Sequence, residues 1–190
     1  MKYFSLTLLL FLLLFPLHAF AQDISQAPVA TATAMASNSA ETQVNYFLPY
    51  PGLLPGTLLY PLKMVRDAAV GFLISDPVKK AKFDLLQADK RVGAAQMLEE
   101  NGDAKKLAVP TFSKAANYFE QAITETKQAK GEGMQVNDLV NTLHSANEKY
   151  QEIALDMERG MPAQERGLLM EITTRLKMLG QRVNQLMPKK

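Results

Sequence analysis

The chain has 190 residues, no cysteine and no tryptophan, and its 21 basic and 19 acidic side chains leave a formal net charge of +2. The lack of cysteine excludes disulfides, thiolate metal sites, cysteine nucleophiles and lipid-modified cysteines. The charge is nearly balanced and basic residues do not interleave with aromatic ones, which disfavours nucleic acid as a partner. The length is sufficient for one domain that is stabilised by burial alone.

Residues 1–21 have the pattern of an export signal. Lys2 supplies a positive start, residues 4–17 are almost wholly apolar, and Ala19-Phe20-Ala21 offers a cleavage pattern before Gln22. An uncleaved anchor is the alternative, because about 20 apolar residues span a bilayer. The sequence predicts a secreted or extracytoplasmic protein, in the periplasm or at the cell exterior, that contacts a membrane only if the signal is uncleaved.

Two segments of unusual composition follow the signal. Residues 22–45 are rich in Ala, Thr and Ser, which predicts a flexible linker. Residues 46–61 contain prolines that exclude a regular helix, so an extended segment is predicted, with turns at Pro51-Gly52 and Pro55-Gly56. This segment is richer in large apolar side chains than a solvated linker, and its candidate contact residues are Tyr46, Phe47, Leu48, Pro49, Tyr50, Pro51, Leu53, Leu54 and Tyr60.

Two hypotheses account for the apolar side chains of residues 46–61. In the first, the segment is a strap whose aromatic rings fill gaps between helices. In the second, it is a docking strand that binds in the aromatic groove of a partner. We favour the strap.

Several short motifs connect the segment to the first helices: LPYPGLLP at residues 48–55, LYPLK at 59–63, SDPVKKA at 75–81 and ADKR at 88–91. On these motifs, residues 46–130 resemble the bacterial domain-of-unknown-function family 5667. The resemblance implies an extracytoplasmic helical domain of unassigned activity. It transfers no catalytic, metal or ligand residues, and the chain after Gly131 lies outside it.

Residues 62–188 predict an all-α fold, an antiparallel up-down bundle of four to five helices. Asp76 or Ser75 is the expected cap of a helix that begins at Pro77, and Asn101-Gly102 is its expected left-handed stop. The expected inner face of the first helix is formed by Val65, Ala69 and Phe72. The predicted helices are residues 61–73, 77–100, 103–130, 136 or 137–159 and 162–186.

Apolar residues recur at alternating spacings of three and four, which predicts left-handed bundle packing. Alanine recurs every seven residues on both sides of Asn101-Gly102, so three pairs of alanines are equidistant from this turn and should meet in a close antiparallel hairpin. Pro110 implies that the later helix kinks, or that it starts near Val109 and one alanine contact is lost. The six alanines are Ala81, Ala88, Ala95, Ala108, Ala115 and Ala122.

Sites for chemistry are sparse in the sequence. His144, Glu148 and Glu152 share one helical stripe and are weak candidates for metal ligands. A di-metal bundle requires Glu-x-x-His on two helices, so we favour a solvated stripe. The basic cluster of residues 79–82 is expected to be solvated helix surface, with anionic lipid heads or wall polymers as the alternative partner. No catalytic or cofactor-binding residue is predicted.

The sequence therefore predicts an exported, non-enzymatic helical-bundle protein without a cofactor. Its expected role is a structural or protein-interaction module of the cell envelope or exterior, with a protein or an envelope component as partner. A holdase-type chaperone that shields apolar clients through its Met- and Leu-rich faces is the alternative. An unrecognised hydrolase is a distant third, and no oligomeric state is predicted.

Overall fold

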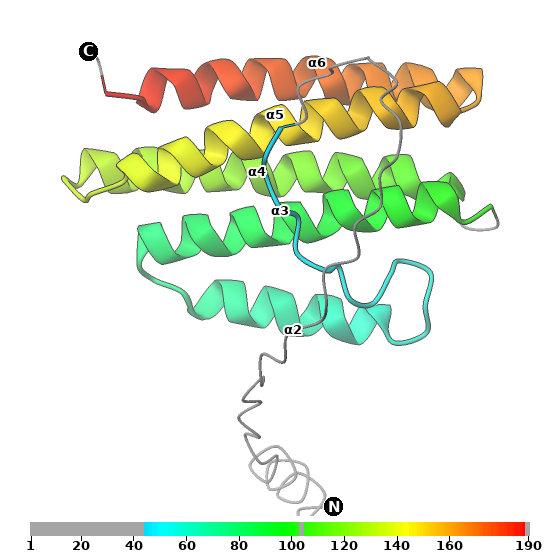
Figure 1. The fold of residues 1–190 in the computed structure, drawn as a ribbon. Coiled ribbons are helices and arrows are strands. Elements are labelled where there is room, and N and C mark those ends of the chain that lie inside the picture. The colour runs from blue at the N-terminus through cyan, green and yellow to red at the C-terminus, as the bar shows by residue number, and fades with distance from the viewer. Residues whose placement is uncertain (1–43, 103–104, 189–190) are drawn as a thin grey trace, which may run out of the picture. The chain divides into compact units, whose positions relative to one another are not determined.

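The computed structural model describes residues 44–102 and 105–188, which confirm the predicted all-α bundle. The export signal and almost all of the linker were predicted in residues 1–43, outside the described residues. Within the described ranges no helix is long and apolar enough to cross a membrane. With the labels of Figure 1, the helices are α2 (Tyr60–Leu73), α3 (Pro77–Glu100), α4 (Ala108–Gly131), α5 (Asn137–Gly160) and α6 (Ala163–Leu186), and a 3-10 turn, η1 (Lys105–Leu107), precedes α4.

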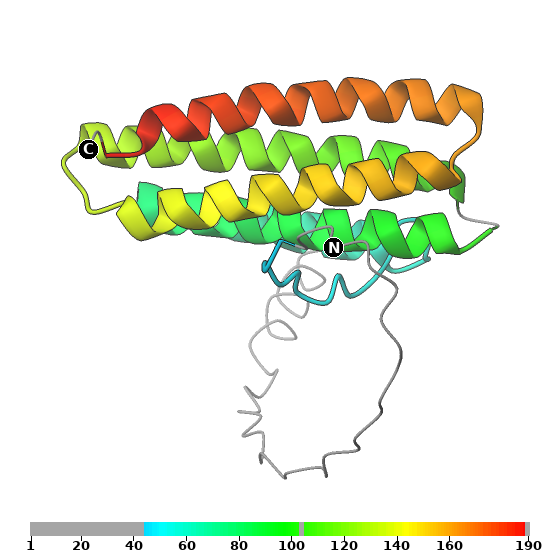
Figure 2. The same ribbon diagram turned by 45° about the horizontal axis from the view of Figure 1, so that its top comes forward.

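Four helices, α3 to α6, form the bundle as two antiparallel hairpins. α3 packs most extensively against α4, and α5 packs against α6. The hairpins join through contacts of α3 with α5 and of α4 with α6, while the consecutive helices α4 and α5 touch little. Consecutive helices run in opposite directions, as predicted. The neighbours α3 and α5 therefore run parallel to each other, as do α4 and α6 (Figures 1 and 2).

The start of α3 follows the expected capping pattern. The Asp76 carboxylate accepts a 2.7 Å hydrogen bond from the backbone N–H of Lys79, and Pro77 occupies the first helical position. The expected left-handed stop at Asn101-Gly102 is wrong. Asn101 is extended, with φ −90° and ψ 103°, and the positive-φ glycines among the described residues are Gly52, Gly56 and Gly133.

The start of α4 also differs from the expectation, because the helix begins at Ala108 rather than at residue 103. Pro110 is consequently the third helical residue, where a backbone N–H has no partner within the helix and its loss is harmless. Of the two expected outcomes of Pro110, the late start is correct. The expected loss of Ala108 from the packed face does not follow, since Ala108 is fully buried.

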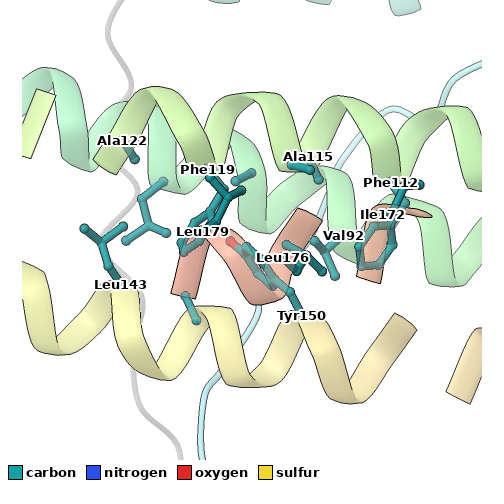
Figure 3. Packing of buried hydrophobic residues seen from close by; sticks show 14 of the residues in the cluster. Val92, Phe112, Ala115, Phe119, Ala122, Leu143, Tyr150, Ile172, Leu176 and Leu179 are labelled. Atoms are coloured by element: carbon teal, nitrogen blue, oxygen red, sulfur yellow. The ribbon is translucent and has the colours of Figure 1, made fainter. Parts of the chain in front are cut away.

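The core positions inferred from the three-and-four spacing are buried along α3, α4 and α6. All six alanines of the predicted hairpin are fully buried between these helices. Larger side chains fill the space toward α5 and α6, including Phe119, whose ring meets that of Tyr150 edge-on at 5.2 Å between centroids (Figure 3). The alanine-lined contact between α3 and α4 thus lies beside a core of large apolar side chains.

A buried amide links α5 to α6. Asn147 is 3% exposed, and its Nδ2 donates to the carbonyl oxygen of Leu176 at 2.9 Å. A Cβ at Gly180 would lie 2.5 Å from the Asn147 Oδ1, so the absence of a side chain at Gly180 makes room for the amide. This pair fixes how the two helices align along their axes.

The first helix contradicts its predicted orientation. Val65, Ala69 and Phe72 were expected to face the bundle, but all three are exposed, and Phe72 is 89% exposed. The buried residue of α2 is Asp67. The helix begins at Tyr60, just inside the segment predicted as extended, and among the helices it packs only against α3.

We expect Ala88→Leu to destabilise the protein by about 1–3 kcal/mol, because added methylenes in a filled contact force the two helices apart. Ala115→Leu should have the same effect. Urea unfolding followed by circular dichroism measures the free energy of unfolding, and Ala68→Leu, at an exposed position of α2, is the matched control. If Ala88→Leu unfolds at the same urea concentration as the parent chain, the close alanine contact is incorrect.

Candidate interaction surface

The outward side of α2 is apolar except for Arg66. Leu62, Val65 and Leu73 are 70%, 67% and 77% exposed, and Ala69 and Phe72 lie on the same side. We call these five residues the α2 face. A surface helix normally turns its apolar stripe toward the core, so this arrangement is the reverse of the usual one.

The inward side of α2 contains a buried acidic residue. The Asp67 carboxylate is buried, and its Oδ1 accepts hydrogen bonds from the Nε and an Nη of Arg66 at 3.0 and 2.7 Å. Its Oδ2 is buried without a partner among the described residues. On α3, Arg91 lies over the ring of Tyr118 at 4.2 Å and donates to the Met64 sulfur at 3.2 Å. The contact of Arg91 with Met64 holds this side of α2 against α3 and leaves the apolar side outside.

Backbone contact also holds α2 in this orientation. A Cβ at Gly71 would lie 3.0 Å from the ring of Phe83, so the ring packs directly on the α2 backbone. Near the other end of α2, Met64 contacts Arg91. The two contacts together show that α2 runs antiparallel to α3. The orientation is therefore fixed at both ends of the helix.

The segment before α2 crosses α5 and α3 on its way to that helix (Figure 1). The backbone N–H of Val44 donates to the Glu152 carboxylate on α5 at 2.9 Å, and Lys63 of α2 donates to the carbonyl oxygen of Pro51. Tyr46, Leu48 and Leu54 pack against the core, as the strap hypothesis requires, and Pro51 is buried.

Other residues of the same segment face solvent. Phe47 is 94% exposed and Tyr50 is 75% exposed, while Leu53 is also exposed. Pro49 is half-buried, and Tyr60 is the half-buried first residue of α2. Inward and outward side chains alternate from residue 46 to 48, as expected for extended backbone. The segment thus combines a strap on its inner side with exposed apolar groups on its outer side.

A groove of about 420 Å³ lies between this segment, α2 and α3. It combines apolar walls with three cationic side chains, those of Lys63, Arg66 and Lys90. Burial lowers the pKa of Lys63, whose ammonium already donates to the carbonyl oxygens of Pro51 and Leu53. The apolar walls are formed by Tyr50, Pro51, Gly52, Leu53, Leu59 and Leu62.

Asp89 of α3 is the second polar centre. Its carboxylate accepts hydrogen bonds from the hydroxyl of Tyr46 at 3.0 Å and from that of Tyr150 at 2.5 Å. Burial raises the pKa of Asp89 to about 6, and the bonds from Tyr150 and Tyr46 limit the rise. Burial also raises the pKa of both tyrosines. The three residues tie the strap, α3 and α5 together.

The weak metal candidates do not converge on one point. His144 Nε2 lies 3.4 Å from the Glu148 carboxylate, but Glu152 binds Lys149 and the backbone of Val44 instead. Among the described residues no group of three or more His, Cys, Asp or Glu side chains could hold a metal ion. The basic cluster divides, because Lys80 pairs with Glu125 while Lys79 and Lys82 are exposed.

Sequence reasoning missed Asp67, Arg91, Asp89 and Tyr150. One signal was available, because Asp67 is the single acidic residue between residues 44 and 75 and interrupts an apolar helix. An acidic residue on the same stripe as Tyr60, Met64 and Gly71 marks the side that packs on α3. Arg91 and Tyr150 carry no comparable mark, since their partners lie far away in the sequence.

The fold and this surface define an all-α bundle with an apolar helix packed on its outside. The chain belongs to the family described as Domain of unknown function (DUF5667), whose pattern matches residues 52–163. The resemblance seen in the sequence is thereby confirmed, although the match extends past Gly131 through α5 and begins later than residue 46. No curated protein and no solved structure matched the chain.

The raised pKa of Asp89 predicts a pH-dependent stability. Its ordinary pKa is 3.8 and its pKa in the fold is about 6, so the fold favours the neutral carboxyl. The stabilisation that goes with the neutral form is complete below pH 3.8 and is lost as the pH rises through about 6. Asp84, also buried on α3 and with a pKa of about 6, contributes in the same direction.

We therefore expect Asp89→Asn to reduce the fall in melting temperature between about pH 5 and about pH 8, because the asparagine stays neutral at both. Thermal unfolding followed by circular dichroism measures this difference for each variant. Asp138→Asn, at an exposed position of α5, is the control and should fall as the parent chain does. If the melting temperature falls equally in Asp89→Asn and in the parent chain between these pH values, the raised pKa of Asp89 is contradicted.

Proposed function

We propose that this protein is an exported, non-enzymatic interaction module of the cell envelope or exterior, which binds an envelope component through the α2 face. One observation carries the proposal: α2 turns its apolar side outward, while Met64 and Gly71 on the opposite side contact α3. The pattern of residues 1–21 supports export. The family adds no activity to this reading, since its description is that of a domain of unknown function.

The exposed apolar side chains favour binding over a purely structural role. Contiguous apolar surface in water is unfavourable, and large exposed patches on folded proteins mark sites of interaction. On α2 the apolar residues follow one another along a single helix, and Leu59 and Leu62 continue them into the groove. A surface of this kind is suited to one partner that covers it.

The holdase alternative has a different requirement. Promiscuous client binding is typical of flexible, Met-rich surfaces. Met157 and Met161 are buried in the core. Met170 and Met178 are exposed, but they belong to α6 and not to the α2 face. The apolar groups of α2 are instead Leu, Val, Ala and Phe on a helix anchored by contacts at both ends, which favours a defined partner.

Photo-crosslinking in intact cells tests the proposal. A photoreactive amino acid at position 72 should form adducts with a small, reproducible set of envelope components, because that side chain is 89% exposed on the α2 face. The same amino acid at position 178, on the exposed side of α6, is the matched control and should give few adducts. Equal adduct patterns at the two positions would show that the α2 face is not a binding surface.

Two further measurements separate the alternatives. The exported chain should begin at Gln22 and be reached by protease added outside the cytoplasmic membrane, whereas a chain retained inside contradicts export. The purified protein should not prevent aggregation of chemically denatured, unrelated proteins. Suppression of aggregation for several such proteins would favour the holdase.

A further inference from the structure

We infer that the envelope component is an anionic lipid surface: the α2 face inserts among acyl chains while the cationic groove beside it takes a phosphate headgroup. The inference rests on the proposed function and names its partner. Three features of the described residues carry it: the apolar face, the distribution of charge around it, and the shape of the groove.

The charge around the α2 face is mostly positive, and the exposed acidic residue next to α2 in the sequence, Asp76, is engaged in capping α3. Asp67 is the single acidic residue from position 44 to 75, and its carboxylate is buried against α3 and paired with Arg66. No acidic side chain of this stretch is therefore exposed to repel an anionic surface. At the other end of the helix, exposed Lys79 and Lys82 follow in the first turns of α3.

The groove provides the cations at the border of the apolar surface. The Arg66 side chain is 67% exposed and keeps contact with Asp67 through one side of its guanidinium. Lys90 has no hydrogen-bond or ion-pair partner in the part of the chain that the structure describes, whereas Lys63 is already held by carbonyl oxygens. Arg66 and Lys90 are thus the side chains that can donate hydrogen bonds to a phosphate. Leu59 and Leu62 line the same groove and can contact the acyl chains.

The geometry of α2 fits a helix that lies in the membrane plane. Its 14 residues extend about 21 Å, too short to cross a bilayer, and its apolar side is continuous along that length. Interfacial helices bury such a side below the headgroups and are strengthened by basic residues at that level. Phe47 and Tyr50 add exposed aromatic groups in the preceding segment.

A second copy of the chain fits the surface less well. Two α2 faces in contact would bring the cationic borders of both copies together, with no exposed carboxylate on residues 44–75 to pair with Arg66. Like charges brought together are unfavourable, whereas a phospholipid headgroup supplies the missing anion. This mode of membrane contact differs from the one expected from sequence, because it needs no uncleaved signal.

The absence of tryptophan from the chain allows a direct test. We would prepare the chain from Gln22, which removes the apolar residues 4–17 but keeps the compact unit Glu41–Lys190 whole. In Phe72→Trp, mixing with vesicles of equimolar phosphatidylcholine and phosphatidylglycerol should shift the emission to the blue, and brominated acyl chains should quench it. Met178→Trp, at an exposed position of α6, is the control and should show neither effect.

Vesicle co-sedimentation then measures affinity. Leu62→Ser with Phe72→Ser should weaken binding to the anionic vesicles by at least about tenfold, because two large side chains no longer leave water. Leu168→Ser with Met178→Ser removes two exposed apolar groups from α6 and should leave binding unchanged. Lys90→Gln should weaken binding to anionic vesicles several-fold and change binding to pure phosphatidylcholine little.

Three results would overturn the lipid assignment. The first is no binding of the parent chain to anionic vesicles, and the second is equal binding by Leu62→Ser with Phe72→Ser. The third is a parent chain that sediments as a dimer and does not bind vesicles, together with a double variant that sediments as a monomer. That result would assign the α2 face to a second copy of the chain. If vesicles fail but crosslinks from position 72 identify a defined protein, the lipid assignment is wrong and the proposed function stands.

Discussion

One carboxylate, that of Asp89, joins three parts of the fold that lie far apart in the sequence. It lies on α3, accepts a hydrogen bond from Tyr150 of the second hairpin, and accepts another from Tyr46 of the strap. Burying a charge is unfavourable unless hydrogen bonds compensate it, so the two hydrogen bonds together stabilise the buried Asp89 carboxylate. The position of the strap, and with it the point at which the chain enters α2, follows from this cluster.

The orientation of α2 shows how a few specific contacts can outweigh exposed apolar surface. Turning Phe72 and its neighbours inward would bury more apolar surface, but it would break the contact of Arg91 with Met64 and the close packing of the Phe83 ring on Gly71. The observed state keeps these contacts and leaves the apolar side uncovered. A partner that covers this side adds hydrophobic stabilisation without disturbing these contacts, so binding requires no rearrangement of the bundle.

Local patterns predicted α3 to α6 well because each pattern has a local cause. The cap at Asp76, the spacing of the alanines and the breaks between helices are set by residues close together in the sequence. The orientation of α2 was mispredicted because periodicity locates an apolar stripe but does not show what covers it. The Asp89 cluster was missed for a related reason, since its tyrosines lie 43 and 61 residues away along the chain.

The long reach of the strap has a consequence for the order in which the protein can fold. The backbone N–H of Val44 donates to Glu152, 108 residues later, and Tyr46 shares the Asp89 carboxylate with Tyr150. A chain made from its N-terminus therefore presents the strap long before its partner residue on α5 has been made, and contacts between distant residues form late. The apolar helix α2 packs only against α3 among the helices, so its docking site exists as soon as α3 has formed, whereas the contacts of the strap are completed only after α5 has been made.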